Sequence, residues 1–315
     1  MKSLCSYIIP ESVFNTNVYQ DVSLFDMDSI KKDISDASGE YIPNWYWPEN
    51  EKSIPYSFFR GRKITKLDIS NIRQTGSISN LNNSFSDMIY LKEFIAEDMD
   101  FHNLESMHGM FYDCPRLESV YISNWKTGKV SSIDDMFLND HNLRAIDLSA
   151  IHFAPKLTIT DAFRGCSKLE SIDLGSNTNC SAGFGWGGTP PNLFKQCWNL
   201  KYIRLGSLNM AYKDDSLKDC EKLEVFDGEF ILTSGSILWT FPKSLRSMRI
   251  KIRTKPTTNH CDFSHLVNLD TDSIQYIIDN LRPDPYGTIE APSIWSISEK
   301  QKSQIKNKKW KLIEK

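Results

Sequence analysis

Few groups of residues in this 315-residue chain have the types and spacing that metal chemistry requires. His260-Cys-Asp-Phe-Ser-His265 contains residue types that bind zinc, but histidines five positions apart do not share a helical face, and no partner pair accompanies them. Asp98-x-Asp100-x-x-Asn103-x-Glu105 lacks the glycine and the spacing of a calcium-binding loop. We therefore predict no metal site.

One glycine-rich stretch formally matches a cofactor fingerprint. Gly183-x-Gly185-x-x-Gly188 has the dinucleotide-binding spacing, but two prolines follow it, no helix opens on the last glycine, and no strand–helix–strand unit surrounds it. The chain also has no phosphate-loop lysine, no Gly-x-Ser-x-Gly elbow and no His-Glu-x-x-His. We expect no cofactor and no catalytic residues.

Two carboxylates keep one enzymatic alternative open. Asp147 and Asp173 occupy equivalent positions of neighbouring repeats, and glycoside hydrolases use a pair of carboxyl groups. A hydrolase would need this pair in a cleft, whereas the pattern places both residues on an open sheet face. We expect a protein that is not an enzyme, with a glycan hydrolase as an alternative.

These residues lie within an internal repeat. The stretch Met110-Phe-Tyr-Asp-Cys-Pro-Arg-Leu-Glu-Ser-Val-Tyr-Ile122 returns from 136 to 148 and again from 162 to 174, so that Phe111, Phe137 and Phe163 are 26 residues apart. A fixed period of this size is typical of a solenoid. Counting from Phe as position zero, Leu recurs at +6 and apolar residues recur at +9 and +11. Weaker copies extend the array to about eight units, with anchors at 58, 85, 111, 137, 163, 194, 217 and 239.

Each unit combines two hydrophobic periods. Apolar residues at −4, −1 and 0 have the spacing of one helical face, and those at +9 and +11 have strand spacing. We therefore predict an α/β solenoid of helix–turn–strand units, with a parallel sheet on one side and helices on the other, capped at both ends. Leu-x-x-Val-x-Ile at 117–122 and Leu-x-x-Ile-x-Leu at 143–148 match the leucine-rich-repeat core.

The full pattern, Met-Phe-x-x-Cys-x-x-Leu-x-x-Ile-Asp-Leu-Ser, is narrower than that core. Over residues 57–255 it resembles the BspA-like leucine-rich repeats of bacterial surface proteins, including the related repeats of mycoplasma lipoproteins. Known relatives are mostly non-enzymatic adhesins that bind host or microbial macromolecules. The resemblance therefore implies recognition or adhesion, with a protein or glycan as the partner.

The repeat divides the chain into three parts. Residues 1–56 are expected to form an N-terminal cap or attachment segment, in which Asn44-Trp-Tyr-Trp-Pro48 either packs on the first unit or forms an exposed contact patch. Residues 57–255 form the array. Residues 256–315 are expected to form a C-terminal α/β cap, with helices at 272–281 and 298–308 and strands at 288–291 and 310–313.

This tail supplies a second resemblance. Ser273-Ile-x-x-Ile-Ile-x-x-Leu281 and the closing Lys-x-Trp310-x-Leu312 are similar to the C-terminal cap of many leucine-rich-repeat proteins from gut Bacteroidetes, such as Bacteroides, and from phages that infect them. The resemblance keeps a second function open, in which the chain is a structural component of a bacteriophage particle, uses its caps to dock on virion neighbours, and serves as a docking or host-recognition module.

The cysteines follow the repeat as well. Cys114, Cys166, Cys197 and Cys220 share position +3. We predict a column of small, buried thiols. A disulfide between neighbours such as Cys197 and Cys220 is the alternative.

Residues at +8 and +10 are expected to face outward from the sheet, where solenoids usually bind partners. Phe184 and Trp186 lie in an expanded loop of the fifth unit, and alternating Lys and Arg continue from 249 to 255. An ordinary solvated face, or charges that protect a sheet edge, would produce similar patterns. The candidate partner-binding residues are Tyr121, Asp147, Asp173, Trp186, Tyr202, Arg204, Arg249, Lys251 and Arg253.

Net charge and targeting signals leave the partner open. The formal net charge is −3, which selects no partner class and gives no specific nucleic-acid signal. No apolar run approaches the ~18 residues that span a bilayer. Cys5 follows Leu4, but no apolar segment precedes it, so we expect neither a secretory signal nor a lipoprotein signal. A virion-associated or cytoplasmic location is therefore expected ahead of the cell surface.

Overall fold

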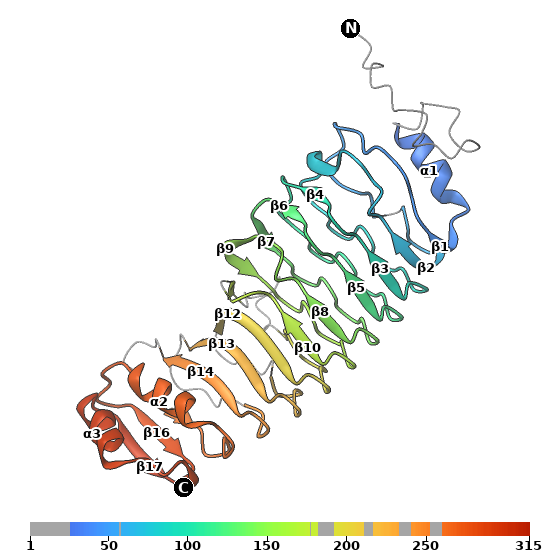
Figure 1. Ribbon diagram of the computed structural model, residues 1–315. Coiled ribbons are helices and arrows are strands. Elements are labelled where there is room, and N and C mark those ends of the chain that lie inside the picture. Colours follow the sequence, from blue (N-terminus) through green and yellow to red (C-terminus); the bar gives the residue numbers. More distant parts are fainter. Residues whose placement is uncertain are drawn as a thin grey trace.

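The structure is a computed structural model that describes residues 26–56, 58–176, 178–181, 192–210, 217–232, 241–252 and 260–315. The chain winds into an elongated rod, with α1 and β1 at one end and β16 and β17 at the other (Figure 1). Strands of successive turns pair in parallel along the rod. The predicted parallel-sheet solenoid is therefore confirmed.

The main face of the rod carries one strand from each turn. Neighbouring strands pair in parallel, except that a single backbone bond, from Arg144 N–H to the Glu118 carbonyl at 3.4 Å, bridges the junction between β5 and β8. Among the described residues, nine strands follow one another here, one more than the eight units predicted. They are β1 (Ser38–Tyr41), β2 (Lys63–Asp68), β3 (Glu93–Ile95), β5 (Ser119–Tyr121), β8 (Ala145–Asp147), β10 (Ser171–Asp173), β12 (Tyr202–Met210), β13 (Val225–Leu232) and β14 (Ser247–Ile252).

A second face is formed by short strands later in each turn. Isolated parallel bridges start it, from Ser53 to Asn80 and on to Ser106 and Ser132. Toward the C-terminal end this face joins the distal halves of β12, β13 and β14, which bend across both faces through a shift in register. The strands of this face are β7 (Val130–Ser132), β9 (Phe153–Thr158) and β11 (Asn179–Ser181). β4 (Asp100–Phe101) and β6 (Lys126–Thr127) pair with each other in a separate two-stranded sheet, and a 3-10 turn, η2 (Thr75–Ser77), precedes β4.

α-Helices occur in the two end segments of the described chain. At one end, α1 (Met27–Ser35) buries Ile30 and Ile34. At the other end, α2 (Thr271–Asp279) and α3 (Glu299–Asn307) alternate with β15 (His260–Asp262), β16 (Thr288–Ala291) and β17 (Lys311–Glu314), with the 3-10 turn η3 (Ser293–Trp295) between β16 and α3. The predicted helix–strand–helix–strand order of the tail is observed, within about two residues at each boundary.

Around Phe85, Phe111, Phe137 and Phe163, where the structure describes the whole segment, the helices predicted before each Phe are not observed, because those segments form successive turns. Residues two positions before and two positions after the Phe have positive φ, which an α-helix does not allow. Asn, Asp and Gly occupy these positions, and these residue types tolerate the left-handed conformation. They are Asn83, Asp87, Gly109, Asp113, Asp135, Asn139, Asp161 and Gly165.

The backbone hydrogen bonds explain why this conformation is stable. Phe111 donates its N–H to Met136 O of the next turn at 2.9 Å, whereas Tyr112 donates to Gly109 O within its own turn, also at 2.9 Å. The N–H groups at −2 and +2 likewise reach the following turn, so every second N–H bonds between turns. An α-helix would keep all of these bonds within one segment. These segments therefore form a hydrogen-bonded corner of a mostly β solenoid, and not the helical layer that was predicted for an α/β solenoid.

The core is a column of phenylalanines along the rod axis. Phe85, Phe111, Phe137 and Phe163 stack on one another, with ring centroids 5.5 to 5.9 Å apart. At the N-terminal end the column continues through Phe59, 5.4 Å from Phe85, and not through the predicted anchor Phe58. Phe59 restores the 26-residue spacing to Phe85. Each buried ring contributes about 1.5–3 kcal/mol through removal from water.

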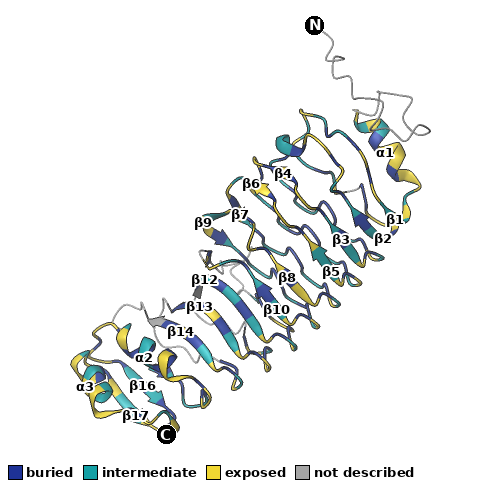
Figure 2. Ribbon diagram, in the orientation of Figure 1, coloured by how far each residue is buried: buried dark blue, intermediate teal, exposed yellow. Residues whose placement is uncertain are grey.

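The N-terminal tryptophans close the first turn. Trp45 is 2% exposed and Trp47 is fully buried. Trp45 stacks on Phe59, and Trp47 contacts Phe58 edge-on, with centroids 6.3 Å apart in both pairs. The aromatic cluster therefore packs on the first turn and is not an exposed patch, while the attachment role of residues 1–56 stays a prediction. Figure 2 shows buried and exposed residues alternating along the strands, as the +9 and +11 positions predicted.

Candidate binding surface

The +10 side chains form a row on the main face, because the strands that carry them pair in register. Asp147 lies opposite Asp173, Asp173 opposite Arg204, and Arg204 opposite Asp227. The buried +9 residues, such as Ile146, point to the other side of the same strands. The structure thus brings together the predicted residues from β8 to β14.

Four members of this row neutralise one another. The Arg204 guanidinium lies 3.2 Å from Asp173 Oδ2 and 3.6 Å from Asp227 Oδ2, and Arg249 Nη2 lies 4.0 Å from Asp227 Oδ1. The hydrogen bond to Asp173 raises the pKa of Arg204, so this group stays charged. Tyr202 donates its hydroxyl to Asp227 Oδ2 at 3.4 Å. Exposed ion pairs of this kind contribute about 0–1 kcal/mol each to the free energy of unfolding. They leave little unbalanced charge in the part of the row from β10 to β14.

The other end of the row is different. Asp147 makes no ion pair with any residue that the structure describes, and its strand neighbour Asp173 carries the same charge. Asp147 Oδ1 accepts the N–H of Ser149 at 2.9 Å, and the residue is exposed. On the preceding strand, the Tyr121 ring is 49% exposed. An exposed aromatic ring and an unpaired carboxylate therefore lie on neighbouring strands.

The +10 aspartates also have a local structural role that the sequence analysis did not identify. Asp68, Asp147 and Asp173 each accept the N–H two residues later, at 2.8 to 3.0 Å. This contact closes the turn that follows the strand. The signal was present in the recurring Asp-x-Ser or Asp-x-Gly of the motif. It accounts for the repetition of aspartate here without a binding role.

Three of the predicted binding residues cannot be assigned a surface position. Trp186 and Arg253 lie outside the described residues, as does Phe184. Lys251 belongs to β14, where the structure describes its backbone but not its side chain. Their roles stay predictions.

A second charged row, at position +7, was missed. Its signs alternate over seven successive turns, so each charge lies between opposite charges of the neighbouring turns. Lys201 Nζ lies 2.7 Å from Glu170, and Arg246 Nε lies 3.7 Å from Glu224. Reading the +7 column down the repeat would have found it. The row is Lys92, Glu118, Arg144, Glu170, Lys201, Glu224 and Arg246.

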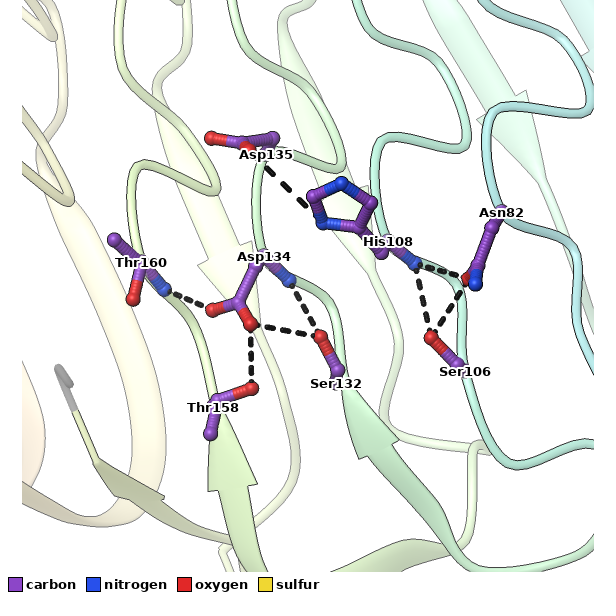
Figure 3. Close-up of polar contacts among 8 residues, drawn as sticks. All are labelled: Asn82, Ser106, His108, Ser132, Asp134, Asp135, Thr158 and Thr160. Atoms are coloured by element: carbon purple, nitrogen blue, oxygen red, sulfur yellow. Dashed lines mark hydrogen bonds and ion pairs between the residues drawn. The ribbon is translucent and has the colours of Figure 1, made fainter. Parts of the chain in front are cut away.

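Another corner of the rod carries a seam of polar side chains that link successive turns (Figure 3). Asn82 Oδ1 accepts the hydroxyl of Ser106 at 2.7 Å and a backbone N–H of the same turn. Asp134 repeats this arrangement two turns later, accepting the Thr158 hydroxyl at 2.7 Å. At the intervening turn, His108 lies 3.9 Å from Asp135 instead. Burial raises the pKa of Asp135, which the His108 ring opposes. These bonds are satisfied within the rod, so the seam stabilises the stacking of turns.

The cysteine column is confirmed as buried, free thiols. Each Sγ donates to the backbone carbonyl of the core Phe in the preceding turn. Cys114 donates to Phe85 at 3.1 Å, and Cys166 donates to Phe137 at 3.0 Å. Burial raises the pKa of these thiols well above the usual value, so they are poor nucleophiles.

Asp140 occupies the same slot in the turn between them. Its Oδ1 accepts the N–H of Cys114 at 2.8 Å, while its fully buried Oδ2 has no partner. Burial raises the pKa of Asp140 well above its usual value, because the charged form has lost its water.

Within the described ranges, no group of three or more His, Cys, Asp or Glu side chains is arranged to hold a metal ion. His260 lies on β15 beside Glu290, and the imidazole Nε2 is 3.6 Å from that carboxylate. Among the helices that the structure describes, none has the length and hydropathy needed to cross a bilayer.

Comparison with known proteins adds one match. Residues 54–177 match the sequence profile of a family described as Mycoplasma protein of unknown function, DUF285. No curated protein matches the chain. The matched segment contains the turns around Phe85, Phe111, Phe137 and Phe163 and every residue of the seam in Figure 3. This part of the chain is therefore similar to a mycoplasma repeat family, and the narrower BspA-like resemblance is not confirmed by the match.

Proposed function

We propose that this protein is a non-enzymatic recognition or adhesion protein that binds a protein or glycan through its main sheet face. The observation that carries the proposal is the contrast within the +10 row. Tyr121 is 49% exposed and Asp147 makes no ion pair with a described residue, whereas the neighbouring Asp173, Arg204 and Asp227 are paired. The binding surface is therefore centred on β5 and β8.

The chemistry of this surface suits recognition. An aromatic ring offers a large, rigid contact area, and an adjacent carboxylate accepts hydrogen bonds from an amine, amide or hydroxyl of the partner. Small residues at +8, namely Ser119, Ala145 and Ser171, leave the backbone of the sheet accessible beside Tyr121. Because the face is built on hydrogen-bonded strands, little conformational entropy is lost on binding.

The arrangement of Asp147 and Asp173 favours recognition over hydrolysis. The two carboxylates lie side by side on an open sheet, and Asp173 is engaged by Arg204. A glycosidase would place its carboxyl groups on opposite sides of a bound glycosidic bond. Recognition requires no such enclosure.

The test compares variants for capture of surface components from microbial or host-cell extracts. The full chain is immobilised, and bound components are identified and quantified. We expect Tyr121→Ala to weaken capture by about 1–3 kcal/mol, with no change in melting temperature. Asp147→Asn, which keeps the acceptor for Ser149 N–H, should weaken it by a smaller amount.

The control is Tyr286→Ala, which removes another exposed tyrosine from the far end of the rod. It should leave capture unchanged. If Tyr121→Ala and Asp147→Asn bind every component as strongly as this control does, the sheet face is not the binding surface.

A further inference from the structure

The edge of the rod that precedes the main strands has a regularity that the sheet face does not share. At position +5, a cation occurs in every second turn, and an uncharged residue occurs in the turns between. The series is Tyr90, Arg116, Asn142, Lys168, Asn199 and Lys222. All three cations are exposed.

Each +5 cation is held by the uncharged residue of the preceding turn. Lys168 Nζ donates to Asn142 Oδ1 at 2.6 Å, and Lys222 Nζ donates to Asn199 Oδ1 at 2.7 Å. The asparagines are fixed in turn, since Asn142 donates its amide to the Pro115 carbonyl at 2.6 Å. The ammonium groups are therefore oriented by neutral partners, which do not cancel their charge.

Arg116 follows the same arrangement with an aromatic partner. Its guanidinium lies 5.5 Å from the centroid of the Tyr90 ring. Neither Arg116, Lys168 nor Lys222 makes an ion pair with a described residue. Each keeps hydrogen-bond donors for an external acceptor.

The adjacent +7 row, with four cations and three carboxylates, adds one net positive charge to this edge. Glu170 of this row is held by Lys201 at 2.7 Å, and that hydrogen bond is the main cause of the lowered pKa of Glu170. Over positions +5 and +7 of the seven turns from 85 to 246, seven cations accompany three carboxylates, although the whole chain has a net charge of −3. The edge therefore attracts anions.

The spacing of the +5 cations distinguishes among polyanions. Strands of a sheet lie about 4.8 Å apart, so cations in every second turn are about 9.5 Å apart. A polysaccharide with one carboxylate per disaccharide places its charges two sugar rings apart, which is close to this distance. Side chains on one face of an extended peptide repeat at about 6.6 Å, and a nucleic acid carries a charge on every residue.

We propose that this edge, defined by Arg116, Lys168 and Lys222, binds a linear acidic polysaccharide that carries one carboxylate per disaccharide. Each cation contacts the carboxylate of one disaccharide, and the neutral +5 residues lie opposite the uncharged sugars. The edge is separate from the sheet face around Tyr121, so the proposal does not depend on that surface.

The experiment measures binding of fluorescent hyaluronan oligosaccharides to the full chain by polarisation, at several salt concentrations. We expect Lys168→Gln with Lys222→Gln to weaken binding at least tenfold and to reduce its salt dependence, because fewer ion pairs form. Lys300→Gln with Lys306→Gln removes two exposed lysines of α3 that make no ion pair with a described residue, and it should leave the affinity unchanged. Tyr121→Ala should also leave it unchanged.

A second variant separates spacing from charge. Asn142→Lys with Lys168→Asn keeps the net charge but moves one cation by a turn, and it should weaken binding several-fold if its melting temperature is retained. Equal affinity of this variant and the wild type would overturn the two-turn match. The proposal would be overturned if the edge and α3 double variants had equal effects, or if hyaluronan did not bind. It would also be overturned if single-stranded DNA or polyglutamate bound more tightly than hyaluronan.

Discussion

The regular turns around Phe85 to Phe163 and the C-terminal segment from β15 to β17 bury similar apolar faces but connect their strands differently. In the regular turns, the connection before the next strand is a series of turns that share hydrogen bonds with the following turn. In the C-terminal segment, α2 and α3 make the connection and satisfy their own backbone. Both arrangements produce apolar residues with helical spacing.

Capping residues and positive-φ residues decide between the two. Asp270 accepts the N–H of Ser273 at the start of α2, and Ser298 forms a capping box with Gln301 at the start of α3. The regular turns instead place Asn, Asp or Gly where φ is positive, as at Gly109 and Asp135. Hydrophobic spacing predicts which side chains are buried, and these polar positions predict the backbone conformation.

The largest expected effect comes from the aromatic column in the regular turns. Phe137 stacks between Phe111 and Phe163, and Phe137→Ala leaves a cavity enclosed on both sides. We expect a loss of about 3–5 kcal/mol in the free energy of unfolding, measured by urea denaturation. Ile305→Ala, on α3 near the end of the rod, should cost about 2 kcal/mol, the lower end of the usual range. A smaller loss for Phe137→Ala than for Ile305→Ala would contradict the view that the column is the main core.

Asp140 sharpens the comparison within the cysteine column. Asp140→Cys should raise the free energy of unfolding by about 1–3 kcal/mol at pH 7, because it removes a buried carboxylate oxygen that has no partner. In the equivalent position of other turns, Cys donates to the Phe carbonyl of the preceding turn.

The sign of the pH dependence follows from the raised pKa of Asp140. A folded pKa above the ordinary value of 3.8 means that the contribution of Asp140 to stability is full below pH 3.8 and is lost as pH rises through the folded pKa. The stability difference between Asp140→Cys and the wild type should therefore shrink as pH is lowered from 7 toward 4. Denaturation at three pH values measures it, with Asp140→Asn as the control for charge alone. A difference that grew on acidification would be inconsistent with a raised pKa of Asp140.

A smaller effect tests the turn geometry directly. Gly109 has a φ of +58°, and a Cβ there would lie 2.3 Å from Asn83 Oδ1. Gly109→Ala should lower the free energy of unfolding by about 1–2 kcal/mol. Inside a helix, the same substitution would raise it by about 0.5–1 kcal/mol. Thermal denaturation decides the sign, and a stabilised variant would restore the predicted helix.

In the C-terminal segment, Ser298→Ala should cost about 1 kcal/mol through loss of the α3 cap.

The sequence by itself determined the repeat, the parallel order of strands and the buried positions, because burial at +6, +9 and +11 requires the same residue types in every turn. It also determined the helices of the C-terminal segment, whose caps are local signals. The buried cysteines followed from their shared position. Asp140 shows the limit of this reasoning, since the same slot accepts an acid whose second oxygen has no partner.

Only the tertiary structure decided what lies between turns. Backbone hydrogen bonds at the Phe corner join residues about 25 positions apart, so a local hydrophobic period could not distinguish them from a helix. The same holds for the charged rows. Whether Asp147 is unpaired, while Asp173 is bound to Arg204, depends on the register of strands 31 residues apart in the chain. Side chains from successive turns meet at the strand spacing, and that contact decides which charges remain available to a partner.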